Sequence, residues 1–359
     1  RLAERVSGTS SSKPSPKPAT RPAATAPRPT PISVHREALG DGVFATVDDA
    51  VDAAATAFRE FDGMSLEGRR KIIASIRESM FENAEELARL AHTETGLGRV
   101  EDKVVKNRLV TRKTSGTEVL TPQAVTGDDG LTLTEYAPYG VIGAITPTTN
   151  PTSTIICNTI AMLSAGNSIV FNVHPGPREC SMANVRLLHH AITRAGGPAN
   201  LVTAIATPTI ESAQELMGHE GVRLLAVTGG SGVVRQAMTS GKRAICAGPG
   251  NPPVVVDATA DLEYAARNII AGASFDNNIV CVDEKEVIAV ESIVDDLLAQ
   301  MGQHGARVLN EQELHKVTNV IFTEYPGRRK SGTLEKELIG KNASEILARA
   351  GVASYGDPR

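Results

Sequence analysis

Short apolar runs alternate with helix-length segments between Val141 and Val227, and this alternation constrains the fold more than any other feature of the chain. The runs rich in β-branched residues are 141–145, 169–173, 201–205 and 222–227. Strands that are separated by helices and apolar on both faces are typical of parallel sheets covered on both sides. The sequence therefore predicts an α/β fold with a doubly wound parallel sheet.

The flanking sequence predicts further helices and a second domain. Thr46 and Asp49 stand in capping-box positions before an Ala-rich stretch to Phe61, and further helices are expected around 72–80 and after Asn83. Apolar runs at 254–256 and 287–290 precede a helical segment at 293–301. We expect a tail at 1–34, a first domain at 35–257 and a second domain at 258–359.

Composition excludes several classes of protein. A net charge of −4 over 359 residues and 3% aromatic residues offer neither the basic surface nor the stacking platform of a nucleic-acid binder. Four widely spaced cysteines suggest neither a disulfide framework nor a zinc site. The sequence contains no apolar run long enough to span a bilayer and no signal peptide, so we expect a cytoplasmic protein without a membrane partner.

The segment 9–31 consists mainly of Pro, Ser, Thr, Ala, Lys and Arg, without an acidic or a large apolar side chain. Such a composition cannot bury enough surface to offset the entropy of ordering. Residues 1–34 are therefore predicted to form a disordered Pro/Ala/Ser-rich tail or linker.

Three predicted strand ends carry small or polar residues. They are the segments 146–151, 172–177 and 228–232, which read TPTTNP, NVHPGP and TGGSG. Ligands of doubly wound sheets bind outside the carboxyl ends of the strands, where helix N-termini offer free N–H groups. None of the three is a dinucleotide GxGxxG fingerprint, and Gly229 and Gly230 are equally consistent with simple turn geometry.

A fourth segment, Asn277-Asn278-Ile279-Val280-Cys281-Val282, places a cysteine in a short apolar run that follows polar residues. A lone cysteine is most often a small buried apolar residue, and this interpretation fits Cys157, Cys180 and Cys246. Composition alone does not distinguish Cys281 from the other three.

The ordered set of segments 149–151, 174–175, 228–230, 248–253 and 277–281 resembles the aldehyde dehydrogenase superfamily, in particular its CoA-acylating propionaldehyde and acetaldehyde dehydrogenases of bacterial microcompartments. The resemblance implies that Cys281 is the nucleophile and that Asn150, with the Cys281 backbone N–H, forms the oxyanion hole. It implies an NAD/CoA-binding domain at 35–257 and a catalytic domain at 258–359. The cofactor-binding residues that it implies are Thr146, Pro147, Thr148, His174, Pro175, Gly176, Thr228, Gly229, Gly230, Ser231, Val233, Ala247, Gly248, Pro249 and Gly250.

The lack of an acidic residue in one segment favours CoA as the acyl acceptor. Hydrolytic relatives carry a glutamate that activates water in the segment corresponding to 247–253, but no acidic residue lies between Lys242 and Asp257. A thiol is partly ionised at neutral pH and strongly nucleophilic, so CoA needs no such base. We expect an enzyme that converts a short-chain aldehyde, CoA and NAD to acyl-CoA and NADH. The alternatives are a hydrolytic or phosphorylating dehydrogenase with a base from elsewhere in the fold, or a truncated, inactive binding or assembly module.

The resemblance also implies partners. Relatives assemble as dimers or tetramers through a hairpin, for which the candidate lies near 126–138, around Leu131 to Tyr136. In microcompartment relatives an N-terminal helix and linker direct the enzyme to the shell, so residues 1–34 are either such a signal or an ordinary disordered terminus. Related enzymes are longer, and we expect the catalytic domain to be incomplete at its C-terminus. The sequence decides neither which aldehyde is used nor whether NAD is preferred to NADP.

Overall fold

The computed structural model describes residues 39–327, 330 and 332–354, all within the unit Arg36–Arg359. The tail predicted for residues 1–34 lies outside the described residues, and the division into domains at 34/35 and 257/258 stays a prediction.

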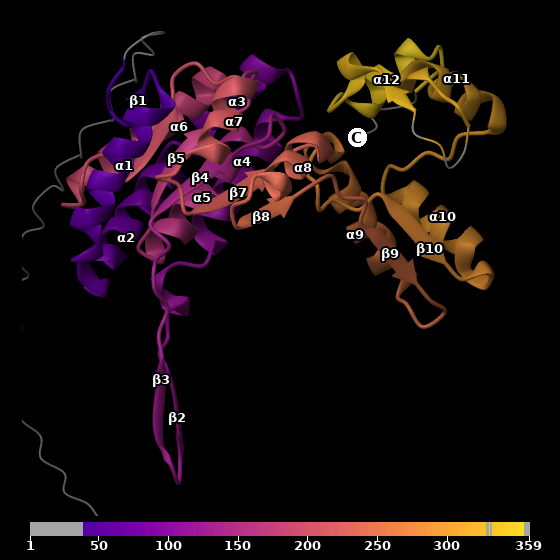
Figure 1. Cartoon of the computed structure of the whole chain (residues 1–359). Helices are drawn as coiled ribbons and strands as arrows, with labels where there is room; N and C mark the ends of the chain where they lie inside the picture. The colour runs from indigo at the N-terminus through magenta and orange to yellow at the C-terminus, as the bar shows by residue number, and fades with distance from the viewer. Residues whose placement is uncertain (1–38, 328–329, 331, 355–359) are drawn as a thin grey trace, which may run out of the picture. The chain divides into compact units, whose positions relative to one another are not determined.

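A six-stranded sheet forms the centre of the first part of the chain (Figure 1). Its strands are β1 (Val43–Phe44), β4 (Val141–Ile145), β5 (Ser168–Asn172), β6 (Val202–Ile205), β7 (Leu224–Thr228) and β8 (Ala244–Ala247). Their order is β1-β6-β5-β4-β7-β8, and every neighbouring pair is parallel. The predicted doubly wound parallel sheet is confirmed. The short strand β1, which pairs with β6, was not predicted.

Eight helices accompany this sheet in the described part of the chain. They are α1 (Val47–Asp62), α2 (Leu66–Glu82), α3 (Ala84–Thr95), α4 (Val100–Lys113), α5 (Pro151–Ser164), α6 (Arg178–Arg194), α7 (Ile210–Gly218) and α8 (Ser231–Thr239). The predicted cap of the first helix is present, since the Asp49 backbone N–H donates to Thr46 Oγ1 at 3.1 Å. No helix among the described residues combines the length and apolarity that crossing a membrane requires.

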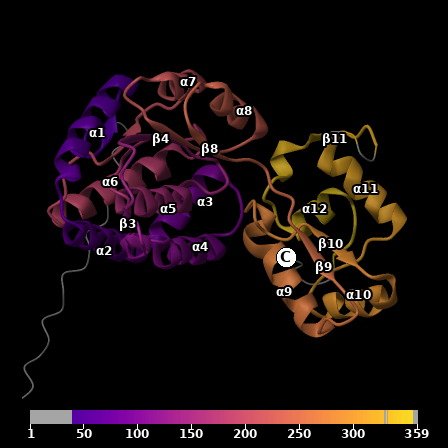
Figure 2. The same cartoon turned by 60° about the horizontal axis from the view of Figure 1, so that its bottom comes forward.

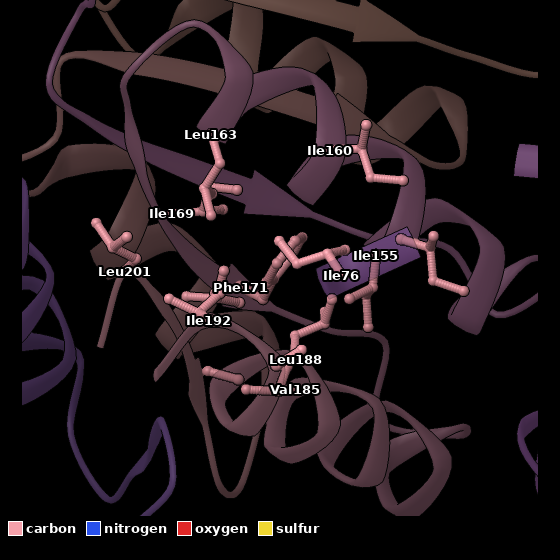
Figure 3. Packing of buried hydrophobic residues seen from close by; sticks show 14 of the residues in the cluster. Ile76, Ile155, Ile160, Leu163, Ile169, Phe171, Val185, Leu188, Ile192 and Leu201 are labelled. Carbon is pink, nitrogen blue, oxygen red and sulfur yellow. The ribbon is translucent and has the colours of Figure 1, made fainter. Parts of the chain in front are cut away.

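The two faces of the sheet bury separate apolar clusters. On β5, Ile169 and Phe171 join one cluster, whereas Val170 between them joins the other. Helices α2, α5 and α6 contribute Ile76, Ile155 and Leu188 to the first cluster, which Figure 3 shows packed around Phe171. Helices α1, α7 and α8 contribute Val51, Leu216 and Ala237 to the second. Because both faces are covered, the strands read as continuous apolar runs.

A two-stranded antiparallel hairpin, β2 (Gln123–Gly127) and β3 (Gly130–Thr134), extends away from the sheet (Figure 1). Every residue of both strands is exposed, including Val125, Leu131 and Leu133. The hairpin lies at 123–134, a few residues before the candidate bounds of 126–138, and its role in subunit assembly stays a prediction.

After β8 the chain forms a smaller parallel pair, β9 (Pro253–Val256) with β10 (Glu286–Ala289). Helices α9 (Leu262–Ser274) and α10 (Val294–Gln303) lie beside this pair (Figure 2). Val256, Ala266 and Leu297 form the buried apolar cluster of this part of the chain. The remaining elements are α11 (Glu311–Ile321), β11 (Phe322–Glu324), β12 (Thr333–Leu334), α12 (Ala343–Arg349) and the 3₁₀ turns η1 (Thr117–Val119), η2 (Phe275–Asn278), η3 (Glu291–Ile293) and η4 (Lys336–Leu338).

Candidate functional site: a cleft at the strand ends

A cleft of about 760 Å³ lies where the strand order of the large sheet reverses. From β4 the chain proceeds outward through β5 and β6, and then returns to the other side of β4 as β7. The ends of β4, β5 and β7 contribute Ile145, Asn172 and Thr228 to the wall. A reversal of strand order at the carboxyl edge is the usual ligand position in this class of fold.

The cleft brings together most of the residues that the sequence singled out. Cys281 and Asn150 both line it, although 131 positions separate them in the chain. The predicted cofactor residues in its wall are Thr146, Pro147, Thr148, His174, Pro175, Thr228, Gly229, Gly230, Val233, Gly248, Pro249 and Gly250. Gly176, Ser231 and Ala247 do not line the cleft themselves. The chemical role of each residue stays a prediction.

Two helices present uncapped N-termini at the cleft. No side chain caps α5 at Asn150 or α8 at Gly230, and neither helix has an acidic residue in its first turn. The N-terminus of α6 differs, because the backbone N–H groups of Glu179 and Cys180 donate to the Glu94 carboxylate at 2.7 and 2.9 Å. Unpaired N–H groups together with the helix dipole favour an anion. The N-termini of α5 and α8 therefore suit an anionic ligand, whereas the N-terminus of α6 is already paired with the Glu94 carboxylate.

Two glycines give the cleft wall its shape. A Cβ atom on Gly230 would meet nothing within 4 Å, so this backbone is open at the start of α8. A Cβ atom on Gly250 would stand 2.2 Å from the carbonyl oxygen of Cys281. Only glycine allows the loop after β8 to pack this closely against the cysteine segment.

Cys281 itself is half-buried and follows an unusual turn. Asp276, Asn277 and Asn278 have φ values of 47°, 55° and 58°, a run of three left-handed residues without a glycine. Asn278 stabilises the turn by donating its Nδ2 to the carbonyls of Ala273 and Glu284 at 2.7 and 3.0 Å. Asparagine and aspartate tolerate this conformation better than other non-glycine residues.

The side chain of Asn150 is held by a buried lysine. Lys106, on α4, donates its Nζ to Asn150 Oδ1 at 2.6 Å, and Asn150 Nδ2 donates to Thr149 Oγ1 at 3.1 Å. An ammonium group has only donors, so the amide atom that faces it must be the oxygen. The nitrogen of the amide consequently lies on the other side, with one N–H left beyond the bond to Thr149.

Lys106 also belongs to a buried ionic cluster around Asp276. The Asp276 carboxylate is fully buried and accepts from Lys106 at 2.5 Å and from Lys103 at 3.1 Å. The Arg99 backbone N–H donates to the same carboxylate at 2.7 Å. Burial lowers the pKa of Lys106 from its ordinary value to about 8, with Asp276 opposing the shift and Lys103 adding to it.

The cluster requires a glycine opposite Asp276. Gly98 has a φ of +65°, and a Cβ atom there would stand 1.9 Å from Asp276 Oδ1. A side chain at this position would displace the carboxylate that two lysines share. The loop between α3 and α4 is thereby tied to the turn before Cys281.

His174 contributes a neutral imidazole. Its Nδ1 accepts from the Gly176 backbone N–H at 3.0 Å, so the hydrogen of the neutral ring belongs on Nε2. Partial burial lowers the pKa of His174. The ring therefore offers a donor to the cleft without a charge.

The wall of the cleft carries positive but no negative side-chain charge among the described residues. Among the described residues that line the cleft, none is aspartate or glutamate, and the basic side chain is that of Lys285. Lys285 donates its Nζ to the carbonyls of Val280 and Asp283 at 3.0 and 3.2 Å, which ties it to the cysteine segment. The wall can accept a phosphate-bearing ligand, but it offers no carboxylate to activate water.

Sequence reasoning missed the contribution of α4. This helix is strongly polar and was not predicted, yet Lys103 and Lys106 are 2% and 7% exposed. Lysines are almost never buried unless paired, and the partner, Asp276, lies 170 positions away. The acidic residue directly before Asn277-Asn278 was the available signal, because it adjoins the segment that the resemblance had already selected.

Comparison with known proteins identifies the family of this chain. The model of the aldehyde dehydrogenase family matches residues 39–320. An acetylating acetaldehyde dehydrogenase of Bilophila wadsworthia is 47% identical over 332 residues, which are 91% of this chain and 68% of that protein. The chain spans about two thirds of the length of the curated relatives that it matches.

Solved structures of similar sequence share the fold. A propionaldehyde dehydrogenase from the fucose utilisation microcompartment of Clostridium phytofermentans is 45% identical with a TM-score of 0.84, covering 89% of this chain and 72% of that chain. A Rhodopseudomonas palustris propionaldehyde dehydrogenase with bound CoA and an acylated cysteine is 44% identical, with the same TM-score and coverage. The chain therefore belongs to the aldehyde dehydrogenase family.

Proposed function

We propose that this chain carries the chemistry of a CoA-acylating aldehyde dehydrogenase. It oxidises a short-chain aldehyde with NAD and passes the acyl group from Cys281 to CoA, giving acyl-CoA and NADH. Its relatives include acetylating acetaldehyde dehydrogenases and CoA-propanoylating propanal dehydrogenases, so the substrate we propose is an aldehyde of two or three carbons.

One observation carries the proposal: Cys281 and Asn150 line a single cleft that also holds two uncapped helix N-termini. A thiolate is a suitable nucleophile for oxidising an aldehyde to a thioester, and an amide N–H is a suitable donor for the oxyanion that forms. Neither residue would be informative alone. Their convergence from distant parts of the chain supports a common reaction.

The wall of the cleft fits a dinucleotide. Phosphates would be held at the start of α8, where Gly230 leaves the backbone open, and the neutral His174 would donate to a ribose hydroxyl. The bound nicotinamide supplies an acceptor for hydride. The residues of this chain do the rest: they bind the aldehyde, orient its carbonyl and hold the acyl group.

In the first half-reaction Cys281 Sγ attacks the aldehyde carbon and forms a thiohemiacetal. The charge on the former carbonyl oxygen is stabilised by Asn150 Nδ2 and the Cys281 backbone N–H. Collapse of this oxyanion expels hydride from the same carbon and leaves a thioester on Cys281. Each oxyanion donor of this kind is worth about 3 to 4 kcal/mol of transition-state stabilisation.

In the second half-reaction the thiolate of CoA attacks the thioester and releases Cys281. The absence of a carboxylate among the described residues of the wall disfavours water as the acceptor, because water needs a general base. A thiol with a pKa near 8.5 is partly ionised at neutral pH and needs none. Phosphate as an acceptor is the remaining alternative.

The test is a product assay on the purified protein with propanal and NAD, with CoA, water alone or phosphate as the acceptor. We expect sustained NADH formation that requires CoA, with propanoyl-CoA identified by mass spectrometry. A rate that is indifferent to CoA, with propanoate as the product, contradicts the acylating assignment. Cys281→Ser should abolish activity. Cys157, on α5, is also a half-buried cysteine, so Cys157→Ser is the matched control and should remain active.

Partners and location follow from the same proposal. We propose that the β2–β3 hairpin, with its exposed Val125, Leu131 and Leu133, mediates assembly into a dimer or tetramer. We further propose a cytoplasmic enzyme that is packaged in a bacterial microcompartment through residues 1–34. A relative described as a microcompartment enzyme supports this location.

A further inference from the structure

We propose that Lys106 is a positioning residue of the oxyanion hole, which orients the Asn150 amide so that its N–H, and not its oxygen, faces the reacting carbonyl. The inference rests on the function proposed above and assigns a task to a helix that contributes no residue to the cleft wall.

The first step of the argument is the amide itself. Asn150 precedes α5 and has a φ of −134° and a ψ of 54°, and its side chain does not cap the helix. Nothing in the chemistry of an isolated asparagine prefers one of the two amide orientations. If the amide were reversed, its oxygen would meet the developing oxyanion, and a stabilising donor would become a repulsive acceptor.

The second step is the partner that breaks this symmetry. Lys106 Nζ stands 2.6 Å from Asn150 Oδ1, and an ammonium cannot accept a hydrogen bond. A reversed amide would place its N–H₂ against three N–H donors in a buried setting. The ammonium therefore selects one orientation on chemical grounds.

The third step is what holds Lys106. Asp276 accepts from Lys106 at 2.5 Å and is itself fixed by Lys103 and by the Arg99 backbone N–H. Asp276 begins the left-handed turn that leads to Cys281. One carboxylate thus connects the group that orients Asn150 to the segment that carries the nucleophile.

The cluster offers a matched control. Lys103 and Lys106 are both buried lysines on α4 that donate to Asp276, but only Lys106 contacts Asn150 in the described structure. Lys103→Met and Lys106→Met each remove one ammonium group that donates to the Asp276 carboxylate. A purely structural role predicts equal effects of the two substitutions on activity.

The experiment measures the pre-steady-state burst of NADH from propanal without CoA, in the full chain, together with thermal unfolding. We expect Lys106→Met to slow the burst about 10- to 100-fold at a nearly unchanged KM for propanal, somewhat less than loss of the donor itself. Lys103→Met, which removes a contact to Asp276 but none to Asn150, should slow the burst much less than Lys106→Met. Equal bursts in the two variants overturn the inference.

A double-mutant cycle separates positioning from a direct effect. Because Lys106 acts through Asn150, we expect Lys106→Met to have no further effect on the burst in an Asn150→Ala background. Additive losses in the double variant overturn the inference. A wild-type protein without any burst overturns the proposed function, and the inference with it, so the two failures are distinguishable.

A pH profile needs no lysine substitution. The ionisable groups that face Lys106 are Asp276, Lys103 and Asp283. Loss of the Lys106 proton above a pH of about 8 gives the amine a lone pair, and the Asn150 amide is then free to reverse. We expect the ratio of wild-type to Asn150→Ala burst rates to fall above that pH, since the two proteins share every other ionisable group. A ratio that is constant from pH 6.5 to 11, a range that includes the ordinary lysine pKa of 10.5, overturns the inference.

Discussion

Gly250 and Cys281 approach each other so closely that a Cβ atom on the glycine would lie 2.2 Å from the cysteine carbonyl oxygen. The contact joins the loop that follows the large sheet to the segment that carries the proposed nucleophile. The position of Cys281 is therefore controlled by a residue that has no side chain.

The substitution Gly250→Ala should displace the Cys281 segment. Because the obstacle is backbone, the loop or the segment must shift, and a small displacement of a reacting group is costly in rate. We expect at least about a 10-fold loss of kcat, by analogy with the roughly 100-fold cost of a 1 Å misplacement. NADH formation with propanal and CoA measures it.

Gly218→Ala is the control for this change. Gly218 ends α7, and a Cβ atom there would meet nothing within 4 Å. This variant should keep wild-type activity. If the activity of Gly250→Ala equals that of Gly218→Ala, the close approach has no bearing on the reaction.

The cysteines should differ in reactivity. Cys180 is fully buried, and burial together with the neighbouring Glu94 carboxylate raises the pKa of its thiol. Cys281 is half-buried and lines the cleft. We expect iodoacetamide at pH 8 to alkylate Cys281 in the native protein and to leave Cys180 unmodified until the protein unfolds. Peptide mass spectrometry over time measures both sites, and equal rates would contradict this assignment of the thiols.

The sheet was predictable because burial on both faces makes a strand visible in the sequence. The run 141–145 and its three successors are apolar at nearly every position, and all four proved to be neighbouring strands. The strand β1 was missed because two residues, Val43 and Phe44, cannot show a period.

The candidate site was predictable only in part. Strand ends and the cysteine segment carry local signals in their glycines, prolines and asparagines, and these segments do meet at the cleft. The pairing of Lys106 with Asp276 carries no local signal, because a lysine on a polar helix is normally solvated. Only the fold brings that lysine inside and shows that it contacts Asn150.

The neutral His174 should serve cofactor binding rather than chemistry. Its Nδ1 accepts from Gly176, and its pKa is lowered by burial, so Nε2–H is available as an uncharged donor at pH 7. We expect His174→Ala to raise the KM for NAD about 3- to 10-fold, the equivalent of one net hydrogen bond, with little change in kcat. Initial rates at saturating propanal and CoA separate the two constants. A loss confined to kcat would place His174 in the chemical step instead.

The buried Asp283 should limit stability at neutral pH. It is 7% exposed, and its Oδ2 has no hydrogen-bond partner among the described residues. Burial raises the pKa of this carboxyl to about 6, against an ordinary value of 3.8, with Lys285 opposing the shift. Between these values the folded state binds more protons than the unfolded state, so the contribution of Asp283 to stability is present below pH 4 and is lost as the pH rises through 6. The uncharged and nearly isosteric Asp283→Asn should therefore unfold at a higher temperature than the wild type at pH 7.5, and the difference should shrink toward pH 5. Thermal unfolding followed by circular dichroism across this range measures the difference, and a gap that is independent of pH would show that the charge of Asp283 is not its source.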